Sequence, residues 1–166
     1  MTLSIIMPVL DETPAIEATL RALSSYRARG VELIVVDGGS SDGTPDLARS
    51  LADRVLTAAR GRALQMNAGA AAARGEVLLF LHADTLLPAD ADRLVLDGLS
   101  RSGRVWGRFD IRIDGGGLLR VVAMMMNTRS RLTGIATGDQ AVFVTRAAFD
   151  AVGGFPPIAL MEDLAL

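Results

Sequence analysis

The fold prediction starts from the stretch Glu76-Val77-Leu78-Leu79-Phe80-Leu81-His82-Ala83-Asp84-Thr85. Its apolar run, bounded by Gly75 before and polar residues after, indicates a short strand buried on both faces. In open α/β sheets, ligands bind outside the carboxyl ends of the strands, so Asp84 lies where a bound metal or phosphate would be met. Asp84 could also cap the following turn, because Asp is common at such junctions. On this stretch alone, the capping role is favoured.

The composition indicates one globular domain. Half of the 166 residues are apolar, which is enough for a sizeable core. The formal net charge is −2, and all 17 basic residues are Arg without a long run, so we predict no nucleic-acid partner. The chain has no Cys and one His, which excludes disulfides, Cys-based zinc sites and His-rich metal sites. The sequence predicts no particular oligomeric state.

No stretch has the length of a membrane span. The N-terminus lacks a basic region before its short apolar run, so we predict a first strand there. Residues 117–126 form the most apolar stretch elsewhere, interrupted by Arg120; we predict a core helix, with an interfacial helix as the alternative. We expect a cytoplasmic location without a transmembrane segment, and peripheral contact with the inner face of the membrane stays open.

Strands and helices alternate along the sequence. We predict strands at residues 3–7, 31–36, 54–57, 77–81 and 141–144, with one or two more within 104–113. Helices are predicted at residues 13–29, from 44 onward, and at 62–74, 88–99, 118–130 and 147–151. Methionines 124–126 are expected to fill the core, with a role in lining the acceptor site as the alternative. This alternation implies βαβ units, and hence an α/β fold with a Rossmann-like, mostly parallel sheet flanked by helices.

Three of the predicted strands end in polar loops, at residues 8–12, 37–44 and 82–84. Parallel topology places such ends along one edge of the sheet, so we expect the loops to line a single crevice. A diphosphate would fit there, because glycines in the second loop permit close backbone approach and a helix N-terminus favours anions. The loop matches neither the P-loop pattern nor the dinucleotide-binding fingerprint.

Five short motifs in succession resemble those of family 2 glycosyltransferases. They are residues 4–12, residues 35–44, Gly61-Arg62 with Asn67-Ala68-Gly69, residues 79–84, and Met161-Glu162-Asp163. Each motif has low specificity alone, but their order and spacing match over nearly the whole chain. The resemblance implies a GT-A fold of the nucleotide-diphospho-sugar transferase type. It also implies a divalent metal, Mg²⁺ or Mn²⁺, and inverting transfer of a sugar to an acceptor hydroxyl.

The resemblance places a set of residues around the nucleotide-sugar donor: Pro8, Val9, Glu12, Asp37, Arg62, His82, Ala83 and Asp84. It implies that Asp37 reaches the base and that Asp84, the last residue of the family's Asp-x-Asp motif, holds the metal on the diphosphate. Carboxylate and phosphate oxygens are the ligands that such hard cations prefer. His82 is expected to hydrogen-bond the ribose or diphosphate, because imidazole suits these cations poorly.

The resemblance also implies residues on the acceptor side. Asp163, with Glu162 beside it, matches the catalytic base that takes the proton of the acceptor hydroxyl. Apart from the resemblance, Asp139 and Gln140 lie just before the last predicted strand and are expected to face the acceptor, with a turn that contains a solvated Asp139 as the alternative. Without the resemblance, an acidic pair such as Glu162 and Asp163 at a helix start would compensate the helix dipole.

Two positions depart from the family pattern. His82 stands where Asp is usual, and Gly38 stands where a second Asp is common. The chain also ends shortly after Asp163, where the family normally continues. We therefore expect residues 1–166 to form a single catalytic domain that lacks a C-terminal segment. Residues 1–100 would form its nucleotide-sugar-binding half and residues 101–166 its acceptor-side half. The alternative function is a nucleotide-sugar-binding domain without transferase activity.

Overall fold

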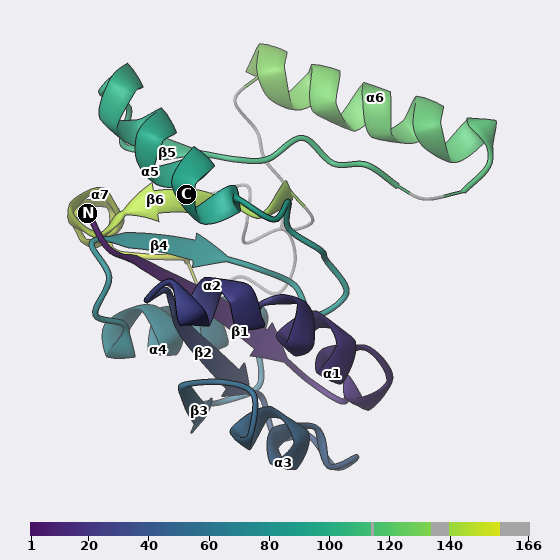
Figure 1. The fold of residues 1–166 in the computed structure, drawn as a ribbon, viewed down its shortest axis with the longest axis vertical. Coiled ribbons are helices and arrows are strands. Elements are labelled where there is room, and N and C mark those ends of the chain that lie inside the picture. The colour runs from purple at the N-terminus through teal and green to yellow at the C-terminus, as the bar shows by residue number, and fades with distance from the viewer. Residues whose placement is uncertain (114, 134–139, 157–166) are drawn as a thin grey trace.

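The computed structural model describes residues 1–113, 115–133 and 140–156. A six-stranded sheet in the order β3-β2-β1-β4-β6-β5 forms its centre (Figure 1). The strands are β1 (Leu3–Val9), β2 (Glu32–Asp37), β3 (Arg54–Thr57), β4 (Val77–Phe80), β5 (Trp106–Gly107) and β6 (Phe143–Thr145). Strands β1 to β4 pair in parallel, whereas β6 is antiparallel to both β4 and β5. The predicted α/β fold with a mostly parallel sheet is confirmed.

Helices cover both faces of this sheet. Within the described residues they are α1 (Thr13–Ala22), α2 (Ser24–Ala28), α3 (Thr44–Arg49), α4 (Arg62–Ala72), α5 (Ala91–Ser102), α6 (Gly117–Thr133) and α7 (Arg146–Val152). Helix α1 carries Pro14 in its first turn, where the missing N–H costs no helical hydrogen bond. Helix α5 ends at Gly103, whose φ of 66° is left-handed and favours glycine.

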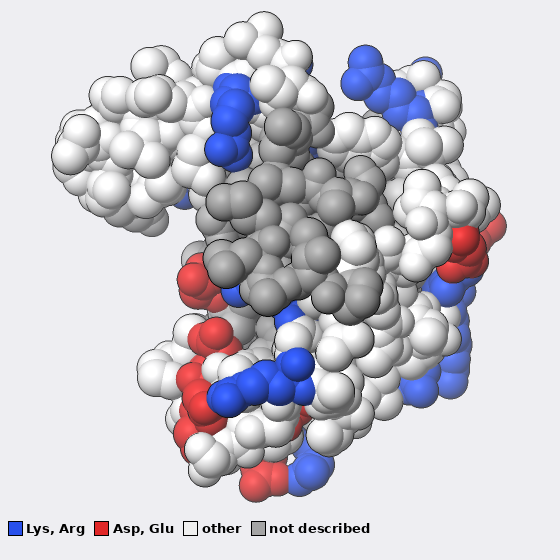
Figure 2. Space-filling view, turned by 180° about the vertical axis from the view of Figure 1, so that it is seen from behind, with Lys and Arg blue, Asp and Glu red and all other residues white. Residues whose placement is uncertain are grey.

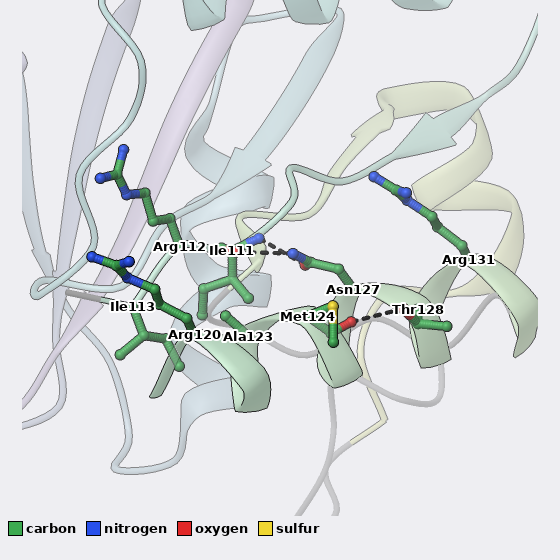
Figure 3. A pocket seen from close by; sticks show the side chains of 9 residues that line it. All are labelled: Ile111, Arg112, Ile113, Arg120, Ala123, Met124, Asn127, Thr128 and Arg131. Atoms are coloured by element: carbon green, nitrogen blue, oxygen red, sulfur yellow. Dashed lines mark hydrogen bonds between the residues drawn. The ribbon is translucent and has the colours of Figure 1, made fainter. Parts of the chain in front are cut away.

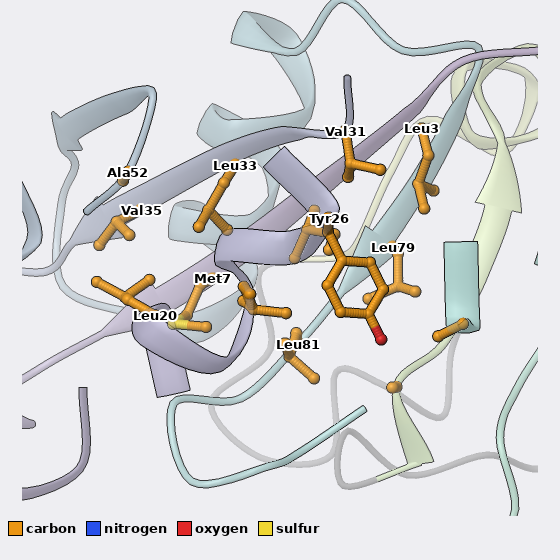
Figure 4. Close-up of a cluster of buried hydrophobic side chains, with 14 of the residues drawn as sticks. Leu3, Met7, Leu20, Tyr26, Val31, Leu33, Val35, Ala52, Leu79 and Leu81 are labelled. Carbon is orange, nitrogen blue, oxygen red and sulfur yellow. The ribbon is translucent and has the colours of Figure 1, made fainter. Parts of the chain in front are cut away.

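The core consists of two apolar layers, one on each face of the sheet. Alternate side chains of β2 enter opposite layers: Leu33 belongs to the layer that contains residues of α1, α2 and α5, while Ile34 belongs to the layer that contains residues of α4 and α7. Figure 4 shows the first layer, in which Leu20 and Tyr26 lie against Leu33, Leu79 and the other strand residues. Each fully buried Leu or Ile contributes roughly 1.5–3 kcal/mol. Burial on both faces explains why the parallel strands are almost entirely apolar.

Helix α4 packs unusually close to the sheet. A Cβ added at Gly69 would lie 2.4 Å from Cγ2 of Ile6 and 3.0 Å from Cγ2 of Val36. Only glycine permits this approach, because any larger residue would push the helix off β1 and β2. The contact fixes α4, and with it the first residues of the helix at the carboxyl edge of the sheet.

The structure changes several predicted elements. The helix predicted over residues 13–29 is divided at Leu23, where the chain turns so that Leu23 and Tyr26 are both buried. Only β5 forms within residues 104–113. The backbone of Ile111 forms hydrogen bonds with the Asn127 side chain of α6, and the N–H of Phe109 donates to the carbonyl of Gln140. The last strand begins at Phe143 rather than residue 141, because Ala141 has a φ of 46° that breaks the extended backbone.

Helix α6 was predicted to be a core helix, and this prediction is wrong. Figure 1 shows it standing apart from the sheet, and only Ala123 and Ser130 are buried. Met124 and Met125 are 61% and 64% exposed, so they do not fill the core as expected. Apolar composition predicted a helix correctly, but it does not say which surface covers that helix.

Within the described residues, no helix combines the length and apolar character needed to cross a membrane. Figure 2 shows arginine side chains in separate groups on one face, with acidic side chains at the lower left and a further group at the right edge. That view contains no broad, uniformly basic surface, which agrees with the scattered positions of arginine in the sequence.

Candidate donor-binding site

The strand register brings the predicted donor residues to one edge of the sheet. Val9 at the end of β1 pairs with Asp37 at the end of β2, and Ile6 pairs with Phe80 near the end of β4. The chain runs from β1 to β2 and β3 on one side, then crosses to β4 on the other side of β1. The carboxyl ends of β1 and β4 therefore flank a topological switch point, where α/β sheets bind ligands.

Hydrogen bonds tie together the loops that follow β1 and β2. The Oγ of Ser40 accepts from the N–H of Asp11 at 2.9 Å, and Oδ1 of Asp11 accepts from the N–H of Ser41 at 2.8 Å. The Oγ1 of Thr44 accepts from the N–H of Glu12 at 2.8 Å. These loops therefore hold one shape through their own side chains.

Asp37 is 4% exposed and uses its carboxylate inside its own loop. Its oxygens accept hydrogen bonds from the N–H of Gly39 at 3.0 Å and from the N–H and hydroxyl of Ser40. Asp commonly shapes turns in this way. Contact between Asp37 and a nucleotide base stays a prediction.

Asp42 links the second loop to the start of α1. Its Oδ2 accepts from the N–H of Thr13 at 3.0 Å, and its Oδ1 accepts from the N–H and hydroxyl of Thr44. Hydrogen bonds from Thr13, and then from Thr44, hold the pKa of Asp42 well below its usual range. The carboxylate thus stays ionised and keeps the loops joined in mildly acidic solution.

Gln65 holds the ends of β1 and β2 together from α4. Its buried Nε2 donates to the carbonyl oxygens of Val9 and Val36, both at 2.8 Å. The same side chain explains Gly38, because a Cβ there would lie 3.0 Å from the Gln65 amide. The departure from the family pattern at position 38 therefore leaves room for Gln65.

The turn after β4 presents Asp84 to solvent. The N–H of Thr85 donates to the carbonyl of His82, and the carbonyl of Ala83 accepts from the buried hydroxyl of Thr19 on α1. Asp84 is exposed, and its carboxylate accepts a long hydrogen bond of 3.3 Å from the hydroxyl of Thr85. The backbone is thus anchored while the carboxylate oxygens keep room for another partner.

Asp84 lines a cavity of about 610 Å³, which we call the Asp84 cavity. Residues 85–88 also line it, as does the segment 109–113, which contributes Asp110 and Arg112. Among the described residues, no three His, Asp or Glu side chains gather as a metal site. One exposed carboxylate still fits Mg²⁺ or Mn²⁺, because such ions often take one or two carboxylates and complete their shell with phosphates and waters.

The remaining donor residues lie at this edge in different environments. Pro8 and Val9 are buried in the last part of β1, and Glu12 is half-buried just before α1. His82 is half-buried, and Arg62 is exposed at the first residue of α4. The structure therefore brings together the segments that were expected to surround a donor.

Of the residues predicted on the acceptor side, only Gln140 lies within the described part of the chain. Gln140 is only 1% exposed and donates to Oδ1 of Asn127 at 3.4 Å, and its contact with an acceptor stays a prediction. Asp139, Glu162 and Asp163 lie outside the described residues, so their roles stay predictions.

One buried residue of the site, Gln65, was not singled out in the sequence. Gln65 lies within a run of helix formers, and its one signal was a polar side chain on the otherwise apolar face of α4. Asn67 joins the same helix to the end of the described chain through two hydrogen bonds with the backbone of Phe155, at 2.8 and 3.0 Å. Such long-range partners cannot be identified from one sequence.

A doubly wound sheet with carboxylates around its switch point defines a nucleotide-binding type of α/β domain. The family model described as Glycosyl transferase family 2 matches residues 4–152. The chain belongs to this family.

Curated relatives and solved structures agree with this assignment. A PGL/p-HBAD biosynthesis glycosyltransferase of Mycobacterium bovis is 37% identical over 98 residues, which cover 55% of this chain and 38% of the relative. The chain therefore spans well under half of the curated relatives that it matches. The mannosyltransferase PcManGT from Pyrobaculum calidifontis, solved with GDP-Man and Mn²⁺, has a TM-score of 0.77 and 25% identity, covering 97% of this chain and 49% of its own.

A third comparison supports the fold alone. S. aureus TarS 1-349 in complex with UDP has a TM-score of 0.78 at 19% identity, covering 99% of this chain and 53% of its own. The likeness to these structural neighbours confirms the predicted GT-A fold.

Proposed function

We propose that this chain is the donor-binding part of an inverting, metal-dependent glycosyltransferase. It would move a sugar from a nucleotide-diphosphate donor to an acceptor hydroxyl. One observation carries the proposal: the switch point of the sheet joins anchored loops after β1 and β2 to the exposed Asp84 carboxylate after β4. Family membership and the GDP-Man and Mn²⁺ bound by the Pyrobaculum mannosyltransferase support the same assignment.

Asp84 would hold Mg²⁺ or Mn²⁺ together with the donor diphosphate, and His82 would hydrogen-bond the ribose or diphosphate. The metal would supply positive charge that stabilises the leaving nucleoside diphosphate. Pro8, Val9, Glu12 and the neighbouring loop residues would surround the nucleoside.

Asp163 would act as the general base. It would accept the proton of the acceptor hydroxyl while that oxygen bonds to the anomeric carbon and the bond to the diphosphate breaks, which inverts the configuration. A positioned base of this kind contributes roughly 10²–10⁴-fold to the rate.

A nucleotide screen tests the donor assignment. Thermal unfolding of the full-length protein would be followed with uridine and guanosine diphosphates, with Mn²⁺ or with a chelator. A ligand at a hundredfold excess over Kd stabilises the folded state by about 2.7 kcal/mol, so a true donor nucleotide should raise the midpoint only when metal is present. Failure of every nucleotide to stabilise the protein in the presence of Mn²⁺ would reject the proposal.

A second candidate is a nucleotide-sugar-binding domain without transferase activity. It is motivated by His82, which leaves Asp84 as the one carboxylate in the motif where the family usually has two. Donor binding in both the unmutated protein and Asp163→Asn, with no sugar transfer by either, would favour this candidate. Transfer that is lost in Asp163→Asn would exclude it.

A further inference from the structure

A second cavity, of about 540 Å³, lies between α6 and residues 111–113 (Figure 3). Three arginines line it, Arg112, Arg120 and Arg131, and its described lining contains no acidic side chain. The apolar part of the wall comes from Ile111, Ile113, Ala123 and Met124. Positive charge and apolar surface therefore share one cavity, which we call the arginine cavity.

The wall of the arginine cavity is held by specific hydrogen bonds. Asn127 of α6 donates to the carbonyl of Ile111 and accepts from its N–H, both at 2.9 Å, in the manner of a neighbouring strand (Figure 3). Arg108 donates to the backbone carbonyl of Asn127 at 3.2 Å. The buried Gln140 supports Asn127 from behind. These contacts give the cavity a defined shape although α6 lies apart from the sheet.

The charges around the arginine cavity are unbalanced. Asp110 pairs with Arg108 at 2.6 Å and also with Arg131. Hydrogen bonds from Arg108 and then Arg131 lower the pKa of Asp110, against the opposing effect of burial, so it remains a carboxylate. Arg120 forms no ion pair with another described residue. Residues 108–133 carry five arginines and two aspartates, a net charge of +3 in a chain of overall charge −2.

The arginine cavity adjoins the Asp84 cavity. Both are lined by Ile111, Arg112 and Ile113, so one short segment separates them. In Figure 3, the side chains of Arg112 and Arg120 project toward the same side of the arginine cavity. A molecule held there lies next to the place where the donor diphosphate would be bound.

We propose that the arginine cavity binds an acceptor with an anionic group next to an apolar portion. Arg112 and Arg120 hold the carboxylate or phosphate, for which the planar guanidinium is well suited, and Ile113 and Met124 contact the apolar portion. The inference rests on the proposed transferase function, because it names the class of acceptor for that reaction.

Ligand-observed NMR with the full-length protein tests this assignment. The probes are hexanoate, hexyl phosphate and hexanol, added with saturating nucleoside diphosphate and Mg²⁺ so that the anions cannot occupy the donor site. At least one anionic probe should bind about tenfold more tightly than hexanol, the ratio expected when a charged group gains hydrogen bonds to arginine. Whichever anion is preferred distinguishes a carboxylate acceptor from a phosphate acceptor.

Matched variants show whether the preference for an anionic probe arises in the arginine cavity. Arg112→Gln with Arg120→Gln should remove the preference for the anion, whereas Arg129→Gln should preserve it, because Arg129 lies on α6 but outside the lining. Equal binding of the three probes, no measurable binding of either anion, or the same loss in Arg129→Gln would overturn the inference.

The two proposals fail in different ways. A protein that binds nucleotide but shows no anion preference would contradict the acceptor class alone. A protein that binds no nucleotide but retains an anion preference dependent on Arg112 and Arg120 would contradict the donor site. In that case the arginine cavity would remain an anion site without a role in sugar transfer.

Discussion

The carboxyl edge of the sheet and the α6 region are held in place by different means. At the edge, Gln65, Asp42 and Ser40 join neighbouring loops by hydrogen bonds above a core buried on both faces. Helix α6 leaves most of its apolar residues exposed, and within the described residues Asn127 is among its few links to the rest of the chain. A donor bound as proposed would therefore meet preorganised loops, which lowers the ordering cost of binding, whereas the α6 region, the proposed acceptor side, is held within the described residues by a few polar contacts.

The largest expected difference between these regions concerns leucine truncation. Leu79→Ala in β4 removes a fully buried side chain and should lower the free energy of unfolding by about 2–5 kcal/mol. Leu118→Ala in α6 removes a side chain that is 78% exposed and should change the free energy of unfolding by no more than about 0.5 kcal/mol. Urea unfolding measures both, and similar losses would show that α6 is as well packed as the sheet.

Glycine replacement examines the close contact under α4. Gly69→Val should destabilise the protein by about 1–3 kcal/mol, because its side chain would collide with Ile6 and Val36. Gly98→Ala in α5 is the matched control: its Cβ meets no atom within 4 Å, so it should be neutral or stabilising by up to about 1 kcal/mol. A harmless Gly69→Val would mean that α4 can move away from the sheet freely.

Gln65→Leu removes the bridge between the ends of β1 and β2. The carbonyls of Val9 and Val36 would each lose a hydrogen-bond donor, so the free energy of unfolding should fall by about 1–3 kcal/mol. The nucleotide should also bind more weakly. Chemical denaturation and nucleotide titration measure the two effects. Unchanged nucleotide affinity in a destabilised variant would show that the bridge supports the fold without shaping the site.

The smallest expected effect is a change in acid sensitivity. Arg29 donates two hydrogen bonds to Asp92, both at 2.8 Å, and these contacts lower the pKa of Asp92 from its ordinary value of 3.8. Because the folded-state pKa is depressed, the stabilisation is complete above the unfolded-state value and is lost as pH falls below it. Thermal unfolding of Asp92→Asn should therefore depend less on pH below about 4 than that of the unmutated protein. An identical acid profile would assign the acid sensitivity to other groups.

The strand-end loops could be predicted from the sequence because their signals are local. Apolar runs define the strands, and the polar turns that follow them must share an edge once the strands are parallel. The role of Gln65 could not be predicted, because its partners Val9 and Val36 are distant in the sequence.

The error at α6 has a related cause. Its apolar residues predict a helix, but periodicity alone cannot distinguish a face covered by the core from one left exposed. Of the one or two strands expected within residues 104–113, the two-residue β5 forms, and the backbone after it pairs with Asn127 and with the carbonyl of Gln140. The role of Asp163 stays a prediction based on the family motif.

Metal-dependent nucleotide affinity of an Asp84 variant tests the proposed donor site most directly. Calorimetric titration with a nucleoside diphosphate and Mn²⁺ would compare the unmutated protein with Asp84→Asn, with His82→Ala, and with Asp97→Asn as an exposed control on α5. We expect Asp84→Asn to lose the metal-dependent part of the affinity, His82→Ala to be weakened, and Asp97→Asn to be unchanged. Equal affinity in the unmutated protein and Asp84→Asn would contradict the placement of the metal.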